Sequence, residues 1–463
     1  MGLVSVGLGV ALMASSVPAA SAASFTVDDS DNLLRPGQDG NACPTLAAEP
    51  EPFETWFNTD DIEVRGIIDA SNESPWNFAK KISQLVCGAA KNSTIKVGMY
   101  FMRAIGTSDR GEQDTQVIWD AMKYVHQHRG VKIGFVLDGG KISSQVARKQ
   151  VVKAVKSFAS VYWCGFGCLN YNSAEAFPYA IDHEKFMTIS DTIWGSGYNS
   201  KKANPVVYSS SGNFARSQIR EYMQEATVFY DDYEMWKLVD QRYGYMKACA
   251  NKSVPKVWGR TKKCKFSTKK TGLKSVRKIW VDTVYRHYTD SGRGTTISFS
   301  PQPANADDYF VRQLTDVDCK VDNQVRIAMF KMTSKVAKDL VAKMNGLVKQ
   351  GCSVEIILSQ SGGSNVMEKW VAKLLNAASF EARCTAVPMH TKLVLVGSKG
   401  GHMGRALLGT ANMSQSGLTY SEEHVVTVDS RRAVGIYRTS AQRLYGNLLN
   451  GWNELDQGSV PCK

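Results

Sequence analysis

Short hydrophobic segments alternate with longer amphipathic segments along this chain, and the same order occurs twice. In the first half the pattern predicts a strand, a helix, a strand and a helix, at residues 95–102, 117–128, 131–138 and 144–158. In the second half it predicts the same elements at residues 325–332, 336–348, 353–359 and 365–378. Strands that alternate with helices of this length are typical of α/β units with buried, mostly parallel strands. The pattern therefore predicts two α/β lobes that arose by duplication, each with a mixed, mostly parallel sheet flanked by helices.

A short polar motif follows the predicted elements in each half. His183 and Lys185 lead into a further hydrophobic strand, and His390 and Lys392 lead into its counterpart. A single H-x-K carries little information, but the chain has only seven histidines, so two copies in matching places indicate a functional repeat. The remaining histidines have no counterpart in the other half and are interpreted as surface or structural residues: His126, His128, His287, His402 and His424.

Each motif is followed by a turn of small residues and then by a strand that begins with an acid. The first turn ends at Asn213 and the first strand begins at Glu225, whereas the second turn ends at Asn412 and the second strand begins at Glu423. Glu422 is an alternative to Glu423, and the alignment of the strands favours Glu423. The shared order of His, Lys, Asn and Glu predicts one site at the seam between the two lobes.

These residue types suit the cleavage of a phosphodiester. The reaction requires cations and donors at the nonbridging oxygens, a nucleophile, and an acid for the leaving oxygen. Paired lysines and asparagines supply the first requirement without a metal, so we expect no metal and no other cofactor. Paired imidazoles supply the nucleophile and the acid, because they titrate near neutral pH. The alternation of a strand places the His and Lys of each motif on one face.

The paired motifs resemble those of the phospholipase D superfamily, whose mark is two copies of H-x-K-x4-D, each followed by G-S-x-N. The resemblance covers nearly the whole chain after its N-terminal segment. The Asp position is Ser190 in the first copy, with Asp191 one place late, and Gly397 in the second copy. The resemblance implies that this Asp supports the end of a strand, so we expect its loss to affect the stability of the site more than its chemistry.

The resemblance also implies a role for each site residue. His183 would attack phosphorus to form a phosphohistidine, and His390 would protonate the leaving alcohol and then activate water, although the reverse assignment stays open. The side chains that hold the phosphoryl oxygens would be those of Lys185, Lys392, Asn213 and Asn412. The carboxylates that fix the imidazole tautomers would be those of Glu225 and Glu423, and the assisting hydroxyls would be those of Ser211 and Thr410.

The N-terminal segment predicts export. Residues 4–22 are small and apolar, carry no charge and end in an A-S-A run. This composition predicts a signal peptide at residues 1–22 and a secreted, extracellular protein, although the usual basic residues at its start are missing. A membrane-spanning helix is the alternative, which the high content of Gly, Ala and Ser disfavours.

The ten cysteines, all beyond the predicted signal peptide, fit an oxidising compartment in which disulfides persist. Cys164 and Cys168 are close enough in sequence to pair, and Cys249 with Cys264 would close a small loop. A metal site formed by Cys164, Cys168 and His183 is the alternative, but a structural zinc requires four ligands in a recognisable spacing.

Charge and length suggest how the lobes are arranged. We predict an N-terminal lobe at residues 45–245, a basic linker at 246–280 and a C-terminal lobe at 281–463. Residues 247–278 contain twelve Lys or Arg and no acid, and the whole chain has a net charge of +13. The basic segment is either a solvated linker or an attachment site for an anionic surface or polymer.

Three functions fit these observations. The first is a secreted phospholipase D that acts on phospholipid at a membrane surface. The second is a secreted, metal-independent nuclease or another phosphodiesterase of the same superfamily, with nucleic acid as the alternative substrate. The third is a non-catalytic binder of anionic lipid or polymer. The sequence predicts no obligate protein partner and favours a monomer.

Overall fold

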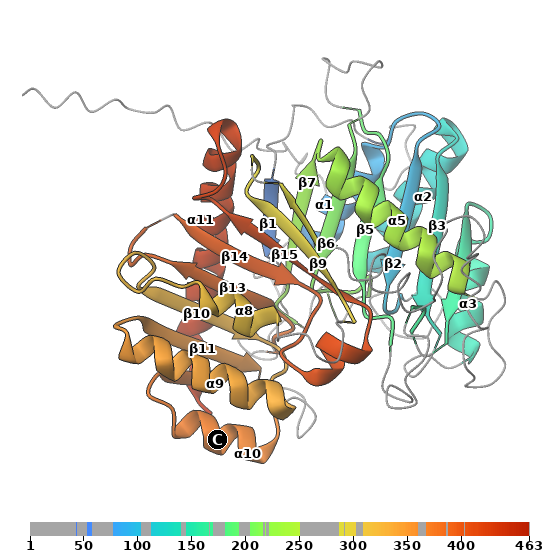
Figure 1. Cartoon of the computed structure of the whole chain (residues 1–463). Helices are drawn as coiled ribbons and strands as arrows, with labels where there is room; N and C mark the ends of the chain where they lie inside the picture. The colour runs from blue at the N-terminus through green and yellow to red at the C-terminus, as the bar shows by residue number, and fades with distance from the viewer. Residues whose placement is uncertain are drawn as a thin grey trace, which may run out of the picture. The chain divides into compact units, whose positions relative to one another are not determined.

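The computed structural model describes residues 43, 53–57, 77–102, 113–139, 145–165, 167–169, 181–193, 204–215, 218, 222–250, 287–290, 292–301, 309–359, 367–385, 388–401 and 403–462. In these residues the chain builds two mixed β-sheets with helices packed against them (Figure 1). The predicted signal peptide and most of the predicted basic linker lie outside the described residues. No helix in the described part of the chain is long and apolar enough to cross a bilayer.

In the described part of the chain the first sheet has seven strands. These are β1 (Phe53–Phe57), β2 (Thr94–Met99), β3 (Lys132–Asp138), β4 (Ala159–Cys164), β5 (Lys185–Ile189), β6 (Val206–Ser210) and β7 (Glu225–Tyr230). Their order across the sheet is β1-β7-β6-β5-β2-β3-β4. All residues of β5, β6 and β7 are buried, so these strands cannot show the alternation of polar and apolar residues that marks a half-exposed strand.

The second sheet has nine strands among the residues that the structure describes, and it repeats the first. These are β8 (His287–Asp290), β9 (Thr295–Ser300), β10 (Gln324–Met329), β11 (Ser353–Ser359), β12 (Glu381–Thr385), β13 (Lys392–Gly397), β14 (Gly404–Gly409), β15 (Glu423–Asp429) and β16 (Ser459–Pro461). Their order is β16-β12-β11-β10-β13-β14-β15-β9-β8. The run from β9 to β12 reproduces the first sheet strand for strand, and β8 and β16 extend it at the two edges. The duplicated α/β fold expected from the sequence is present.

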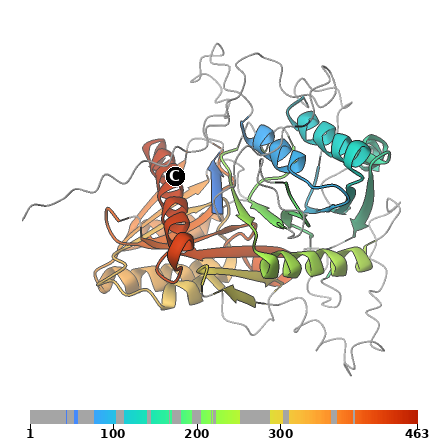
Figure 2. The ribbon, with the colours of Figure 1, turned by 90° about the horizontal axis from the view of Figure 1, so that it is seen from above.

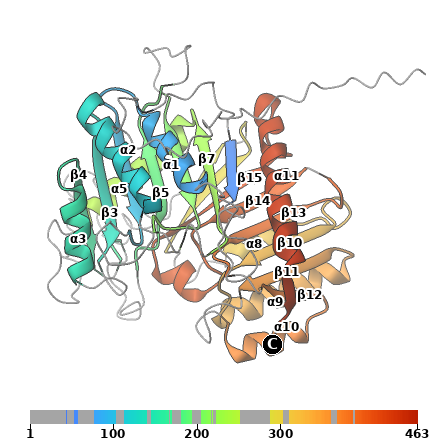
Figure 3. The same ribbon diagram turned by 180° about the vertical axis from the view of Figure 1, so that it is seen from behind.

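The helices occupy equivalent places in the two halves. The first half contains α1 (Asn77–Cys87), α2 (Gln113–Arg129), α3 (Gln145–Val155) and α5 (Tyr233–Cys249). The second half contains α8 (Tyr309–Thr315), α9 (Ser334–Lys349), α10 (Lys369–Asn376), the π-helix η3 (Ser416–Tyr420) and α11 (Gly435–Gln457). Figure 3 shows α1 and α2 beside the first sheet and α9 and α10 beside the second. Helix α5 extends to Cys249, past the start predicted for the linker at residue 246.

The expectation that the strands would be mostly parallel is wrong. In the first sheet β3 is parallel to β2 and to β4, while β5, β6, β7 and β1 pair antiparallel. In the second sheet β11 is parallel to β10 and to β12, and the other pairs are antiparallel. Parallel neighbours require a crossover connection, which helices supply between these three strands of each half. The strands that follow the H-x-K motifs, β5 and β13, were expected to pair in parallel, but they pair antiparallel with both neighbours.

A shared hydrophobic core joins the two halves. It includes Phe186 on β5 and Tyr243 on α5 from the first half, with Leu393 on β13 and Leu448 on α11 from the second. Figure 2 shows these two helices in green and red. Each large apolar side chain that is fully buried contributes about 1.5–3 kcal/mol to folding. The seam is therefore held by packing as well as by polar contacts, which allows it to support a precise site.

The disulfides that join described cysteines are Cys43–Cys87, Cys164–Cys168, Cys319–Cys352 and Cys384–Cys462. The predicted local pair in CGFGC is therefore confirmed. Cys249 is also disulfide-bonded, and the predicted partner, Cys264, lies outside the described residues. The pairs at Cys87 and Cys319 occupy corresponding places before β2 and β10.

Candidate active site

The two H-x-K motifs meet at the seam. His183 lies just before β5, and His390 lies just before β13, which is the equivalent strand. The centroids of the two imidazole rings are 6.3 Å apart. His183 and His390, which are 207 positions apart in sequence, thus face one another.

Crossed backbone pairing produces this approach. The N–H of His183 donates to the carbonyl of Glu422 at 2.9 Å, and the N–H of Glu422 donates to the carbonyl of Ile181 at 3.0 Å. In the other half the N–H of His390 donates to the carbonyl of Met223 at 2.9 Å. Each motif is therefore anchored on the segment that precedes the acid-led strand of the opposite half.

His183 has a carboxylate partner from the second half. Its Nδ1 lies 2.8 Å from Oε2 of Glu423, and its ring packs edge-on against Tyr100, with the centroids 4.8 Å apart. The alternative acid, Glu422, instead accepts a hydrogen bond from the N–H of Leu169 at 2.6 Å. A carboxylate at Nδ1 fixes the ring and leaves Nε2 available for chemistry.

His390 has a different set of partners. Its Nδ1 lies 2.9 Å from the carbonyl oxygen of Ser211, and its ring packs on Phe330 with the centroids 4.5 Å apart. Because a carbonyl oxygen only accepts, Nδ1 of His390 carries a proton, and the neutral ring has its lone pair on Nε2. Nζ of Lys392 is 3.0 Å from the same Nδ1, so this ammonium lies against the imidazole without donating to it.

The expected bond between Glu225 and an imidazole is not formed, which corrects the sequence alignment. The N–H of Ser211 donates to the carbonyl of Glu225, and the N–H of Thr410 donates in the same way to the carbonyl of His424. Glu225 is therefore equivalent to His424, and the position equivalent to Glu423 is one residue earlier, at Gln224. The alignment failed because it matched the first acid of each strand, whereas the pairing with the preceding turn sets the register.

The carboxylate of Glu225 bonds to the preceding turn and to the H-x-K motif of the opposite half. It accepts hydrogen bonds from Oγ of Ser211 at 2.9 Å and from the backbone N–H of Lys392 at 3.2 Å. Burial raises the pKa of Glu225 to about 7, although the Lys392 ammonium opposes this shift. This residue supports the site beneath Lys392, and the described contacts of His390 do not include it.

The two lysines are buried and converge on the same space as the histidines. Nζ of Lys185 donates to the carbonyl of His183 at 2.7 Å, and Nζ of Lys392 donates to the carbonyl of His390 at 2.5 Å. Burial lowers the pKa of Lys185 to about 8, with Glu423 opposing the shift. Burial and the neighbouring Lys185 lower the pKa of Lys392 well below its ordinary value. Two buried ammonium groups destabilise each other unless an anion lies between them.

The asparagines and hydroxyls complete the site. Oδ1 of Asn213 accepts from the N–H of Phe101 at 3.2 Å, whereas Oδ1 of Asn412 is buried and has no hydrogen-bond partner among the described residues. Oγ1 of Thr410 accepts from the N–H of His424 at 2.9 Å. Ser211, Thr410 and Glu225 are thus engaged in fixing the turns, and the contacts of the described residues do not join either asparagine side chain to a histidine ring.

Electrostatics favour the neutral form of both imidazoles before substrate binds. Burial lowers the pKa of His183 well below its ordinary value, and Lys185, Lys392 and His390 lower it further. Burial and the same two lysines lower the pKa of His390. Burial raises the pKa of Glu423, which the two ammonium groups oppose. The site is therefore buried and holds two lysines, whose charged forms a bound anion would stabilise.

The two departures from the superfamily motif have different substitutes. Oγ of Ser190 accepts from the N–H of Thr94 at 2.8 Å, and Oδ1 of Asp191 accepts from the N–H of Asn204 at 2.8 Å, so both residues support the strand end. A Cβ added to Gly397 would lie 2.4 Å from the hydroxyl of Tyr445, so the ring of this α11 residue fills the place of a side chain. The strand ends are supported without the motif Asp in either half.

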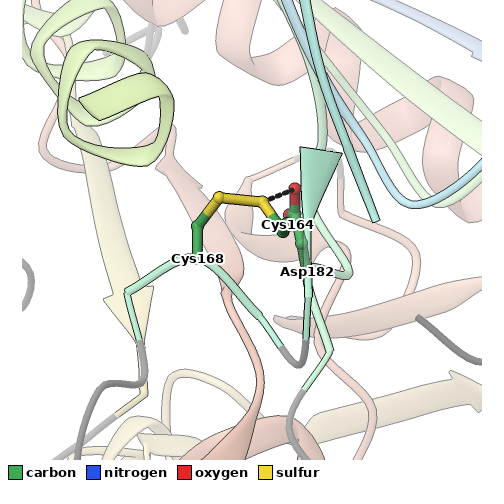
Figure 4. Close-up of side chains that lie close together, drawn as sticks. All are labelled: Cys164, Cys168 and Asp182. Carbon is green, nitrogen blue, oxygen red and sulfur yellow. Dashed lines mark hydrogen bonds between the residues drawn. A yellow bond between two sulfur atoms is a disulfide. The ribbon is translucent and has the colours of Figure 1, made fainter. Parts of the chain in front are cut away.

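The alternative metal site in CGFGC is not formed as proposed. The sulfurs of Cys164 and Cys168 are joined in a disulfide, and a carboxylate oxygen of Asp182 lies 3.5 Å from Sγ of Cys164 (Figure 4). A disulfide lacks the thiolates that bind a metal. His183, the third ligand of that alternative, bonds to Glu423 instead.

Sequence reasoning missed a buried group next to the motifs, formed by Glu184, Arg242 and His424. His424 was interpreted as a surface or structural residue because it has no histidine counterpart, yet it is 2% exposed. Its Nδ1 lies 2.5 Å from Oε2 of Glu184, the middle residue of the first motif. The signal available in the sequence was an acid inside one H-x-K motif and a histidine directly after Glu423.

Comparisons with known proteins agree with this architecture. The profile of a family described as "Cardiolipin synthase, PLD-like domain" matches residues 319–445. The solved structure of phosphatidylserine synthase from Haemophilus influenzae superposes with a TM-score of 0.59 at 13% sequence identity, covering 90% of this chain and 89% of the other. Yeast tyrosyl-DNA phosphodiesterase superposes with a TM-score of 0.43 at 11% identity, covering 82% of this chain and 91% of that chain. No curated protein matches the sequence.

The fold is the duplicated α/β fold with paired motifs at the seam, and the second half carries the matching domain. Residues 319–445 match a family described as a PLD-like domain, and the chain has a fold similar to that of the phosphatidylserine synthase. The paired imidazoles and buried lysines of the site support phosphodiester chemistry.

Proposed function

We propose that the protein is a secreted phospholipase D that hydrolyses the head-group phosphodiester of phospholipids through a phosphohistidine. The observation that carries the proposal is the approach of two imidazoles to 6.3 Å, with a buried lysine beside each. An anionic phosphodiester between the two ammonium groups would remove their mutual repulsion. The substrate thus supplies the negative charge that balances the two lysines.

In the first step, Nε2 of His183 attacks phosphorus and forms a P–N bond. The Glu423 carboxylate holds Nδ1 and stabilises the positive charge that develops on the ring. The bond from phosphorus to the leaving oxygen breaks, and the protonated ring of His390 gives that oxygen its proton. The bound anion offsets the charges of Lys185 and Lys392, so it raises the pKa of His390 toward the range that an acid requires.

In the second step, neutral His390 removes a proton from water, and the resulting oxygen attacks phosphorus. The P–N bond breaks, and phosphatidate leaves. Lys185, Lys392, Asn213 and Asn412 hold the nonbridging oxygens through both steps. Oδ1 of Asn412 has no partner among the described residues, so this amide retains hydrogen-bonding capacity. Transfer of the phosphatidyl group to another alcohol would follow the same path with that alcohol in place of water.

Phospholipid is favoured over nucleic acid by the kinds of protein to which the chain is similar. The matching family profile is named for a cardiolipin synthase, and a structural match that covers most of both chains is a phosphatidylserine synthase. The net charge of +13 suits either anionic polymer or anionic membrane, so it does not distinguish the two substrates. A nuclease or another phosphodiesterase therefore stays the second candidate. Secretion is supported by the apolar N-terminal segment and by the disulfides.

The test is an assay of the mature protein in EDTA with phosphatidylcholine vesicles, and separately with single-stranded and plasmid DNA. We expect release of choline, loss of this release in His183→Ala, and no cleavage of DNA. Cleavage of DNA without release of choline would replace the proposal by the nuclease. Binding of vesicles with no turnover of either substrate would favour the non-catalytic binder.

A further inference from the structure

A buried polar network lies behind the first H-x-K motif, on the side away from the histidine pair. Its centre is the carboxylate of Glu184, which accepts from Nε and Nη2 of Arg242 at 3.1 and 2.8 Å and lies 2.5 Å from Nδ1 of His424. Nε2 of His424 lies 2.7 Å from Oγ of Ser209. All of these residues are at most 2% exposed. The network joins the two lobes, because His424 comes from the second half and the other three residues from the first.

The network is coupled to the catalytic pair by the backbone. Residues 182–184 run beside residues 422–424, with Asp182 and Glu422 bridged in parallel. Consecutive residues of an extended segment point to opposite sides. His183 and Glu423 therefore pair on the side of the site, while Glu184 and His424 pair on the other side. The same two segments are held together by two histidine–carboxylate pairs, in which the histidine comes once from the first half and once from the second.

Further contacts hold the side chains of Arg242 and His424 in place. Arg242 also donates to the carbonyl of Ser300 at 2.6 Å, and its guanidinium packs on the ring of Phe299 at 4.9 Å. His424 lies beside the same ring and beside Phe186, with centroids 6.4 and 6.2 Å away. Arg242 and His424 together lower the pKa of Glu184, against the effect of burial, so its carboxylate stays charged. Groups buried this completely cannot exchange partners with water.

We propose that Glu184, Arg242 and His424 are positioning residues that hold Nδ1 of His183 against Glu423 across the seam. This inference rests on the proposed role of His183 as nucleophile and extends it to the residues that orient the ring. The equivalent places in the other half are occupied by Thr391, for Glu184, and by Glu225, for His424. Thr391 donates to the carbonyl of Met223 at 3.1 Å, so that half lacks the buried ion pair. The device therefore orients one histidine of the two.

The test uses variants of His424 in the full chain. His424→Phe keeps a ring among Phe186 and Phe299 but removes both nitrogens. His424→Asn places an amide N–H where Nδ1 lies and so restores the donor to Glu184. We expect His424→Phe to lower kcat by about 10–100-fold with little change in KM, which is the size of loss found when partners that orient metal-binding histidines are removed. We expect His424→Asn to recover most of that loss. Asp240→Asn is the matched control, because Asp240 lies on α5 like Arg242 and forms a partly buried pair with Lys96 on β2.

A second measurement needs no substrate. In protein labelled at histidine, the downfield N–H resonance of His183, assigned by its loss in His183→Asn, reports the bond to Glu423. We expect this resonance to shift in His424→Phe and to return in His424→Asn. It reads the position of the ring even if the assay for phospholipase D fails, so failure of the proposed function and failure of this inference are distinguishable.

Variants of the ion pair address stability. Glu184→Gln leaves the Arg242 guanidinium buried without a counter-charge, which strongly destabilises the folded state and can prevent folding. The double variant Glu184→Gln with Arg242→Met removes both charges, so it restores folding while leaving His424 without its carboxylate. We expect this folded double variant to share the low kcat of His424→Phe. A folded His424→Phe with unchanged kcat and an unchanged His183 resonance would overturn the proposal. Loss of folding in both His424 variants and in the double variant would also overturn it, because the network would then serve stability alone.

Discussion

The two halves of the site have the same strands in the same order, but they surround their histidines differently. In one half His183 has a carboxylate at Nδ1 and a buried ion network behind it. In the other half His390 has a main-chain carbonyl at Nδ1 and an ammonium against its ring. The difference begins with a single register position, at which one half has Glu423 and the other has Gln224. Duplication therefore supplied two equivalent imidazoles, and their partners made them unequal.

The inequality suits the two tasks of the reaction. A nucleophile requires a fixed ring and stabilisation of the positive charge that it gains, which a carboxylate at Nδ1 provides. A group that alternates between acid and base requires a pKa that responds to the substrate, which a neutral partner and a nearby lysine allow. If the proposed reaction takes place, the carboxylate at Nδ1 favours His183 over His390 as the nucleophile.

The largest expected effect comes from removing each histidine in turn. The substrate is a nitrophenyl phosphodiester, whose leaving group requires no proton. With this substrate, His183→Ala should form no covalent intermediate, and its kcat should fall by at least about 10⁴-fold. His390→Ala should still form the intermediate and should accumulate it, with a loss of about 10²–10⁴-fold on phospholipid. Trapping of the phosphorylated protein by acid quench and mass spectrometry checks this result. Accumulation of the intermediate on His390 in the His183 variant would reverse the assignment.

The next effect tests the register position itself. Glu423→Gln makes the two halves alike, and we expect kcat to fall by about 10²-fold, because the ring of His183 loses the group that balances its charge. The matched variant is Gln224→Glu. The amide of Gln224 donates to the carbonyl of Gln218 and lies near Ser211, so a carboxylate there should change kcat little. Equal losses in the two variants would show that the carboxylate does not distinguish the histidines.

The sequence was sufficient for the parts of this comparison that depend on order. The repeated strand and helix pattern and the paired H-x-K motifs correctly predicted a duplicated fold in which His183 and His390 approach each other. Those features are local in sequence, or repeat with a fixed order, and the seam follows from the duplication. The choice of Glu423 over Glu422 was also consistent with the contact to His183.

The sequence was insufficient where register or long-range burial decides. Glu225 was paired with Glu423 because both begin a strand, but the hydrogen bonds from Ser211 and Thr410 show a shift of one residue. A shift of one residue turns a strand side chain to the opposite face. His424 was interpreted as a surface or structural residue because it has no counterpart in the other half, and its partner Glu184 lies 240 positions away. Neither the register of Glu225 nor the pairing of His424 with Glu184 produces a periodic pattern in the sequence.

The smallest expected effect is a dependence of activity and stability on pH. It reports the charge of Lys185 in the first half of the site. Because burial lowers its pKa to about 8, we expect kcat/KM to fall as the pH rises through that value and the ammonium loses its charge. Stability should change in the opposite direction. The folded chain releases this proton near pH 8 while the unfolded chain holds it up to the ordinary lysine pKa of 10.5, so the free energy of unfolding should rise with pH between the two.

The control for this prediction is Lys185→Met, which removes the titrating group and keeps a side chain of similar length. Denaturant unfolding and initial rates, both measured from pH 7 to just below about pH 10, where tyrosines begin to ionise, check the two trends. The variant should lose most of its activity and should show a flatter dependence of stability on pH than the parent. Only part of the slope should vanish, because Lys392 also has a lowered pKa and contributes in the same sense. An activity that stays constant up to about pH 10, with the same stability slope in both proteins, would show that Lys185 keeps its ordinary pKa and that burial does not destabilise its charge.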